Sequence, residues 1–296
     1  MAMRELHMTV AAEEDGCRVG VLLRRRFGFA PSLLSHLKFV EGSVLRNDAP
    51  VRLIDPARAG DELTVRLAEG GAVSANFPLP LLYEDEDILI LNKPAGIAVH
   101  GASGGRETVE SLWRAAHGAE RPFHPVNRLD RGTSGAMAAA KTGFAQDALR
   151  RALHTEAFRR SYLALVTGEM EPRQGTIDLP LLRVGERSVV SPSGQYAVTH
   201  YETLAAGEGV TLLRLRLETG RTHQIRAHCA ALGHPLLGDV RYGGAVCPLG
   251  HPALHAAELR LRQPVTGAWV QVAAPLPEEL RAECLRRGIN EEKWGR

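Results

Sequence analysis

The chain has 296 residues, of which 44% are hydrophobic and 24% charged, and its formal net charge is +2. This composition is typical of a globular protein. The sequence contains no apolar run of the roughly 18–20 residues that a membrane-spanning helix needs. The four cysteines form no C-x-x-C pair, which argues against a disulfide framework and a thiolate zinc site. Acidic residues occupy the start of the chain where an export signal would be apolar, so we expect a cytoplasmic protein.

A compact unit is predicted between Arg18 and Leu67. Apolar residues recur at helical spacing over 19–23 and again over 33–40, which predicts two short helices. Residues 44–53 are typical of a hairpin, and the alternation over 63–67 predicts a half-buried strand. We therefore expect a small α/β domain at residues 1–70.

Basic side chains gather in this unit and again near the carboxyl end. The segment from Arg18 to Arg52 contains seven basic and two acidic residues, and the segment from Arg221 to Arg262 contains five basic and two acidic residues. A phosphate backbone would favour both patches, although a solvated helix face would have the same composition. The candidates for RNA contacts in the first patch are Arg24, Arg25, Arg26 and Lys38.

A linker is predicted at 68–80, where paired glycines, small polar residues and two prolines interrupt the pattern. The second domain, 81–296, contains more predicted strands than long helices. An apolar strand is expected at 87–92, followed by a helix that Thr108 caps and Gly118 ends. The pattern favours an α+β domain with a mixed, largely antiparallel β-sheet and flanking helices, and its other predicted elements are strands at 136–140, 162–166 and 210–217 and a helix from Thr222 to Gly233.

Two polar segments interrupt these elements. In the first, Asp130 lies between Arg128 and Arg131 in a loop that ends in Thr-Ser-Gly. An isolated R-L-D of this kind is more often a surface ion pair than a site.

The second segment, Gly220–His228, places basic groups at the start of a helix, where unpaired N–H groups and the helix dipole favour an anion. Arg226 and His223 are therefore candidates for RNA contacts. His223 and His228 are five residues apart, which does not match the spacing of a helical zinc pair. We predict no metal site.

The combination of motifs resembles the RluA-type pseudouridine synthases, over about Leu82–Leu280. Asn127 and Arg160 depart from the family pattern, which often has His and Lys there, and both departures concern substrate fit rather than reaction class. The segment Arg18–Leu67 resembles the RNA-binding module named after ribosomal protein S-four. The matching motifs, in chain order, are N-K-P-A-G-I-A-V-H (Asn92–His100), R-L-D-R-G-T-S-G (Arg128–Gly135), R-S-Y-L-A-L-V-T-G (Arg160–Gly168), T-G-R-T-H-Q-I-R-A-H (Thr219–His228) and G-H-P-L-L-G-D-V-R-Y-G (Gly233–Gly243).

The resemblance implies that the chain isomerises uridine in a structured RNA. Asp130 matches the essential carboxylate, which either attacks the anomeric carbon or removes a ribose proton. Arg221 is expected to pair with Asp130 and keep it ionised. Tyr162 is expected to offer the uracil a stacking face, and Arg128 is suited to fill the space that the flipped base leaves. The reaction needs no cofactor, and none is expected.

Other functions stay open at this stage. A non-catalytic RNA-binding or ribosome-assembly protein could keep the same fold. A glycoside hydrolase also breaks a glycosidic bond, but it would need a second carboxylate, for which Asp239 is the nearest candidate. Large-subunit (23S) ribosomal RNA is the expected partner and transfer RNA the alternative, with no membrane partner. We expect a monomer.

Overall fold

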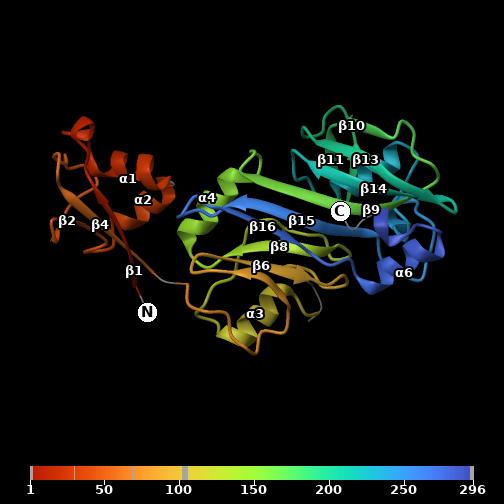
Figure 1. Cartoon of the computed structure of the whole chain (residues 1–296), viewed down its shortest axis with the longest axis horizontal. Helices are drawn as coiled ribbons and strands as arrows, with labels where there is room; N and C mark the ends of the chain where they lie inside the picture. The colour runs from red at the N-terminus through yellow and green to blue at the C-terminus, as the bar shows by residue number, and fades with distance from the viewer. Residues whose placement is uncertain (1–2, 30, 69, 102–105, 294–296) are drawn as a thin grey trace.

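The computed structural model describes residues 3–29, 31–68, 70–101 and 106–293. An amino-terminal module lies at one end of the molecule, beside a larger domain built on one long sheet (Figure 1). The sheet is mixed and largely antiparallel, and few helices flank it. The predicted α+β fold is thereby confirmed.

The amino-terminal module packs two helices against a four-stranded antiparallel sheet with the order β1-β4-β2-β3. Leu22 and Leu23 of the first helix and Leu63 of the last strand have no exposed surface. The first strand is an element that the sequence analysis did not predict, and the second helix ends before Val40, which is exposed. The elements are β1 (Met3–Thr9), α1 (Val19–Phe27), α2 (Pro31–Leu37), β2 (Val44–Arg46), β3 (Ala49–Pro50) and β4 (Glu62–Ala68).

The long sheet has the strand order β10-β13-β14-β9-β15-β8-β6-β5, with β16 paired to β15 and β7 to β8. The pairing of β15 with β8 is parallel, and the other pairs of this sheet are antiparallel. A separate hairpin, β11–β12, lies beside α5. The strands are β5 (Leu81–Glu84), β6 (Ile88–Lys93), β7 (His124–Pro125), β8 (Ser134–Ala140), β9 (Phe158–Thr167), β10 (Gln174–Asp178), β11 (Leu181–Val184), β12 (Arg187–Val190), β13 (Val198–Gly207), β14 (Val210–Leu217), β15 (Leu254–Arg262) and β16 (Trp269–Ala273).

Helices cover both faces of this sheet. In β6, Leu89 and Leu91 pack with Trp113 of α3, whereas Ile88 and Ile90 belong to the apolar cluster that α4 completes. Because successive strand residues point to opposite faces, α3 and α4 lie on opposite sides of β6. None of the helices in the described ranges has the length and hydropathy that crossing a bilayer requires. The helices of this domain are α3 (Val109–His117), α4 (Gly143–Ala152), α5 (Gln224–Ala231) and α6 (Glu278–Arg286).

The predicted caps of α3 are present, whereas the predicted cap of α5 is wrong. The Thr108 hydroxyl accepts a hydrogen bond from the Ser111 N–H at 2.9 Å, and Gly118 follows the last turn of α3. The α5 helix instead begins after His223, which has a left-handed backbone with a φ of 55°. The hydroxyl of Thr222 was expected to cap this helix, but the residue lies one position too early to do so.

Gly135 permits the parallel contact between β8 and β15. Its φ is 108°, and a Cβ atom at this position would lie 2.3 Å from the Ala256 carbonyl oxygen. A side chain would therefore push the two strands apart. This close approach comes directly after the loop that carries Asp130, so the end of that loop is fixed against the centre of the sheet.

The segment predicted as a linker lies against the larger domain. Phe77 is buried, with its ring 5.6 Å from that of Trp113, and the Ser74 N–H donates to His117 Nε2 at 2.8 Å. The Arg121 guanidinium donates to backbone carbonyls at 70–72. The apolar side chain at position 77 explains this packing, because leaving it in water would cost free energy.

The module and the larger domain share an apolar contact. Phe144 of α4 belongs to the module's core cluster, and its ring lies edge-on to that of Phe29 with 4.9 Å between the centroids. Arg4 of β1 forms an ion pair with Asp87, which also accepts a hydrogen bond from Gln263 Nε2 at 2.7 Å. The contact therefore combines a buried aromatic pair with a largely buried carboxylate.

We predict that Phe144→Ala weakens this docking. A buried phenylalanine replaced by alanine costs roughly 3–5 kcal/mol because a cavity remains, and Phe144 is only 2% exposed. Urea unfolding and limited proteolysis near residues 70–80 would report the loss. The matched control is Phe39→Ala, where the side chain is 81% exposed and a change within about 0.5 kcal/mol is expected. Equal stability of the two variants would contradict the docked arrangement.

Candidate active site

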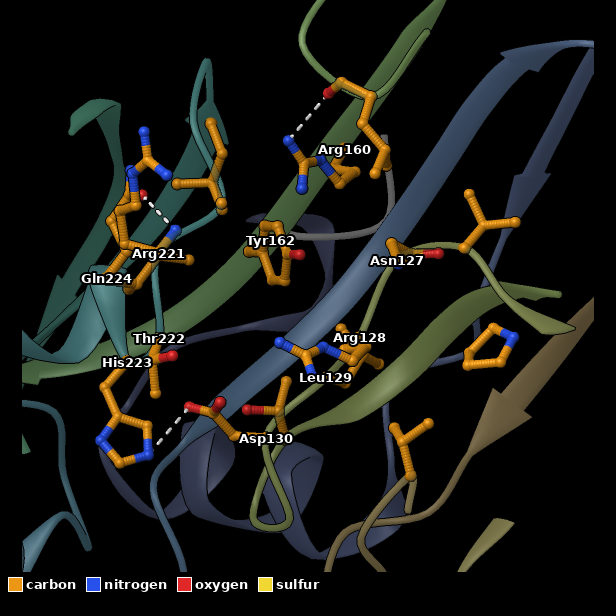
Figure 2. A pocket seen from close by; sticks show the side chains of 18 of the residues that line it. Asn127, Arg128, Leu129, Asp130, Arg160, Tyr162, Arg221, Thr222, His223 and Gln224 are labelled. Atoms are coloured by element: carbon orange, nitrogen blue, oxygen red, sulfur yellow. Dashed lines mark hydrogen bonds and ion pairs between the residues drawn. The ribbon is translucent and has the colours of Figure 1, made fainter. Parts of the chain in front are cut away.

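A pocket of about 570 Å³ opens between the loop before β8, the start of α5 and strand β9. The predicted site residues Asp130, Tyr162, Arg221, Arg128 and His223 all line it (Figure 2). Arg226 lines it as well. The fold thus brings together residues that are up to 98 positions apart in the sequence, from Arg128 to Arg226.

Asp130 lies in the loop between β7 and β8, with its side chain 27% exposed. Its Oδ2 atom is 3.4 Å from Arg226 Nη1 and 3.8 Å from His223 Nε2. The left-handed backbone of His223 turns the imidazole toward this carboxylate (Figure 2). Burial lowers the pKa of His223, although the Asp130 charge acts in the opposite direction.

The predicted pair of Arg221 with Asp130 is wrong, because Arg226 is the arginine that contacts this carboxylate. Arg221 Nε donates to the Tyr196 carbonyl at 3.0 Å, and its backbone N–H donates to Gln224 Oε1. Figure 2 shows Arg221 beside Gln224, away from Asp130. The reason is local: Arg221 precedes the helix, whereas Arg226 lies in its first turn on the side that faces the loop.

Arg226 is itself fixed by Asp239, which is only 1% exposed. Arg226 Nε donates to Asp239 Oδ2 at 2.6 Å and Nη2 donates to Oδ1 at 2.8 Å, so the pair is bidentate. Burial opposes the charge of Arg226, but the hydrogen bonds and charge of Asp239, together with the charge of Asp130, raise the pKa of the guanidinium. The guanidinium also lies 5.0 Å from the ring centre of Tyr242. From the sequence alone, Asp239 was only a candidate second carboxylate, and the G-D-V-R-Y-G segment was the available signal for its structural role.

Tyr162 occupies the inner wall of the pocket. It belongs to β9, is 5% exposed, and packs in the main core cluster of the domain. Burial raises the pKa of its hydroxyl, so the side chain is neutral near pH 7. The ring therefore combines an apolar face with a polar tip at the edge of the pocket.

The two departures from the family pattern have structural partners. Asn127 Oδ1 accepts the Ala138 N–H at 2.7 Å, and Arg160 Nη2 donates to the Leu153 carbonyl at 3.1 Å. Both side chains line the pocket, and each has a buried nitrogen without a partner in the described chain, Asn127 Nδ2 and Arg160 Nε. The two residues therefore brace the pocket wall.

Lys93 anchors the loop that faces Asp130. Its Nζ atom donates to the carbonyls of Pro94 and Ile97, each at 2.8 Å, and approaches that of Arg131 at 3.4 Å. Burial lowers the pKa of Lys93 to about 7, against the influence of the Asp130 charge. Arg131 adds a hydrogen bond from Nε to the Gly96 carbonyl. The N-K-P-A-G segment thus holds the Asp130 loop in place.

The remaining predicted RNA contacts differ in their availability. Arg128 is exposed at the pocket, with Nη1 3.2 Å from His100 Nε2. Arg24, Arg25 and Lys38 are exposed on the module. Arg26, in contrast, donates to both carboxylate oxygens of Glu14, at 3.0 and 3.1 Å, so its guanidinium is already engaged.

Within the described residues, no cluster of His, Cys, Asp or Glu is arranged to hold a metal ion. His228, which the motif placed near the site, is fully buried and bonded to Thr199 and the Leu179 carbonyl. It is a core histidine. The ionisable groups nearest the centre of the pocket therefore include the Asp130 carboxylate, its neighbours Arg226 and His223, and the Tyr162 hydroxyl.

Comparison with known proteins agrees with this site. Residues 87–231 match the family model described as RNA pseudouridylate synthase. The chain is 37% identical to the RNA pseudouridine synthase YjbO of Bacillus subtilis, over 86% of this chain and 93% of the relative. It is 38% identical to the ribosomal large subunit pseudouridine synthase D of Vibrio cholerae, with 93% of each chain covered.

The solved structure of human RNA pseudouridylate synthase domain containing 1 has the same fold. It superposes with a TM-score of 0.56 at 26% identity, over 69% of this chain and 86% of that one. Sequence and structure agree with the family that the motifs predicted. The chain belongs to the RNA pseudouridine synthases.

Proposed function

We propose that this RNA pseudouridine synthase uses Asp130 as its catalytic carboxylate, on a uridine that leaves its stack to enter the pocket. The observation that supports this most is the position of Asp130. It is a partly exposed carboxylate beside a tyrosine ring, with an arginine at 3.4 Å that a second carboxylate holds in place. A catalytic carboxylate needs this combination of access and a cationic neighbour.

The reaction breaks the bond between uracil N1 and ribose C1′, turns the base, and forms a bond from C5 to C1′. The proton on C5 is lost and N1 gains one, so atoms balance without a redox partner. Asp130 either attacks C1′ or removes a ribose proton, and both routes need the ionised form. In either route Arg226 Nη1, 3.4 Å from Asp130 Oδ2, provides a positive charge beside the carboxylate.

Tyr162 and Arg128 have complementary roles in this proposal. A uridine taken out of its stack costs a few kcal/mol, and the Tyr162 ring offers a face on which the base can stack. Arg128 lies exposed at the pocket, where its planar guanidinium can occupy the space that the base leaves and bind phosphate. His223 and Arg221 line the same pocket as further polar contacts to the RNA.

A glycoside hydrolase site is not formed by these residues. Such enzymes place two carboxylates on either side of the bond that they break. Asp239 was the nearest candidate for the second carboxylate, and both of its oxygens accept hydrogen bonds from Arg226. Asp239 therefore supports the pocket rather than faces a substrate.

We predict that Asp130→Asn abolishes isomerisation. Loss of a lone essential group costs on the order of 10⁴-fold or more in rate, and the amide keeps the volume of the side chain. Tritium release from RNA labelled at C5 of uridine measures turnover directly. The control is Asp178→Asn, an exposed aspartate of β10 that does not line the pocket. Activity of Asp130→Asn within tenfold of wild type would rule out the assignment.

A second prediction separates the two arginines. Arg226→Lys should lose at least about 100-fold in turnover, since one ammonium cannot replace a fork that spans two carboxylates. Arg221→Lys should lose far less, because its guanidinium donates to a backbone carbonyl and not to Asp130. Thermal unfolding of both variants must accompany the assay, as Arg226 also binds buried Asp239. The reverse ranking in folded variants would restore Arg221 as the partner of Asp130.

We further propose large-subunit ribosomal RNA as the substrate, with transfer RNA as the alternative. Two observations support this choice: the Vibrio cholerae relative is named for the large subunit, and a module with exposed basic residues on α1 and directly after α2 precedes the catalytic domain. The module's resemblance to that of ribosomal protein S-four supports an RNA-binding role for Arg24, Arg25 and Lys38. Arg26 would contribute less, because Glu14 holds it.

Pseudouridine mapping in total RNA tests the substrate. A strain lacking the gene should lose one or more pseudouridines in large-subunit RNA and regain them when wild type is supplied. The strain supplied with Asp130→Asn serves as the control and should not regain them. Loss confined to transfer RNA would favour the alternative substrate and would leave the catalytic proposal intact.

A further inference from the structure

The strands that form the inner wall of the pocket also present a polar surface on their other face. In β9, Tyr162 points into the main core and toward the pocket, so its neighbours Ser161 and Leu163 point to the rear of the sheet. Helix α6 covers one part of this rear face, where Leu163 packs in a cluster with Leu280. Beyond that helix the rear face is open.

The open part is a groove of about 860 Å³ that crosses strands β10, β13, β14, β9, β15 and β16. Figure 1 shows β13, β14, β9 and β15 side by side in this half of the sheet. We call it the rear groove, and its charged lining consists mainly of the arginines Arg159, Arg214, Arg216 and Arg260, with the glutamates Glu202 and Glu258 among them.

Positive charges are adjacent in the rear groove. Arg159 of β9 and Arg260 of β15 are direct cross-strand partners, and Arg216 of β14 is the partner of Ser161 in β9. Like charges directly opposite one another destabilise a sheet. An arrangement that gathers arginines in this way is therefore more favourable when an anion lies between them.

Two of these arginines have no ion pair within the described ranges. Arg159 pairs with Glu156, and Arg214 lies 3.6 Å from Glu202. Arg216 is exposed and Arg260 is half-buried, with its Nε atom enclosed and without a hydrogen-bond partner. Their charges are thus available to a ligand.

Trp269 orients Arg260, a groove arginine, and also contacts Arg262, which lies outside the groove lining. The guanidinium carbons of Arg260 and Arg262 each lie 4.2 Å from the centre of the Trp269 ring. Trp269 is 38% exposed. Stacking on an aromatic face leaves the N–H edge of a guanidinium free to donate, and it reduces the conformational entropy lost on binding. An arginine held in this way is suited to bind phosphate.

We propose that the rear groove binds the phosphate backbone of the RNA substrate, outside the segment that enters the catalytic pocket. From β14 to β15 the arginines lie on three adjacent strands and span roughly 10 Å at the usual strand spacing, which is enough for more than one phosphate of a strand. An acidic protein partner is less well matched, since the chain belongs to a family of RNA-modifying enzymes whose substrate is itself a polyanion and the groove lining is mostly polar. The proposal rests on the RNA-modifying function but not on which RNA is modified.

The test uses the full chain with Arg216→Gln and Arg260→Gln, singly and together. The probes are a transcript of large-subunit ribosomal RNA and a short uridine-containing hairpin. Affinity for the long transcript is measured at several salt concentrations, because the slope of log affinity against log salt counts phosphate contacts without regard to sequence. Arg114→Gln is the matched control, since it removes one exposed guanidinium from α3, away from the rear groove.

Each groove variant should lower the salt slope by roughly 0.7–0.9 and weaken binding of the long transcript by about four- to sixfold near 0.15 M salt. The double variant should show both losses added together. Turnover on the short hairpin should stay within twofold of wild type, because the catalytic pocket is unchanged. Arg114→Gln should match wild type in both assays.

Three results would overturn the proposal. An unchanged salt slope in the folded double variant would show that the arginines are simply solvated. Loss of hairpin turnover would show that they act through the pocket. Competition by polyglutamate as strong as that by RNA of equal charge would assign the rear groove to acidic proteins. None of these results depends on whether ribosomal or transfer RNA is the substrate, so failure here is separable from failure of the substrate assignment.

Discussion

The bidentate ion pair between Arg226 and Asp239 is the contact on which the rest of the site depends. Asp239 is almost completely buried, and a buried carboxylate needs a charged partner because the desolvation of an unpaired charge costs several kcal/mol. Arg226 meets that need with two nitrogens and keeps a third, Nη1, directed at Asp130. One guanidinium therefore joins the first turn of α5 to the segment after it and to the loop before β8. The position of the guanidinium beside Asp130 therefore depends on Asp239, a residue with almost no exposed surface.

The loop that carries Asp130 is fixed from its other side by backbone contacts. Lys93 and Arg131 donate hydrogen bonds to the carbonyls of Ile97 and Gly96 in the loop after β6, and Gly135 closes the segment against β15. A loop held at both ends and in its middle loses little further entropy when a substrate arrives, which favours a preorganised site. The low pKa of Lys93 arises from the same burial that makes it an effective anchor.

Local patterns were sufficient to predict much of this architecture. Thr108 and Gly118 delimit α3 because capping depends only on nearby residues, and alternation over 210–217 gave β14 with the observed bounds. Contacts between residues that are distant in the sequence could not be predicted in this way. The choice between Arg221 and Arg226 depends on where α5 begins, and the left-handed residue His223 moved that start past Thr222. Strand β1 was missed because only Leu6 of its seven residues is buried, so its sequence lacks the apolar alternation of a half-buried strand. The partner of Asp239 could not be read from a motif at all.

Strand β9 shows how one element can serve two surfaces of an RNA enzyme. Its alternation places Tyr162 toward the pocket and Arg159 and Ser161 toward the rear groove, so a change in the register of β9 would exchange the two faces. Burial of Tyr162 in the core fixes that register, and with it the position of every rear-face arginine on the neighbouring strands.

Substrate contacts on both faces would then be positioned by the same packing energy that stabilises the sheet. An RNA long enough to pass around the edge of the sheet could reach the pocket and the rear groove together, whereas a short hairpin would engage the pocket alone. In that case the enzyme would discriminate between long and short substrates because side chains on both faces of one strand contact the RNA, and no contact to a base would be needed.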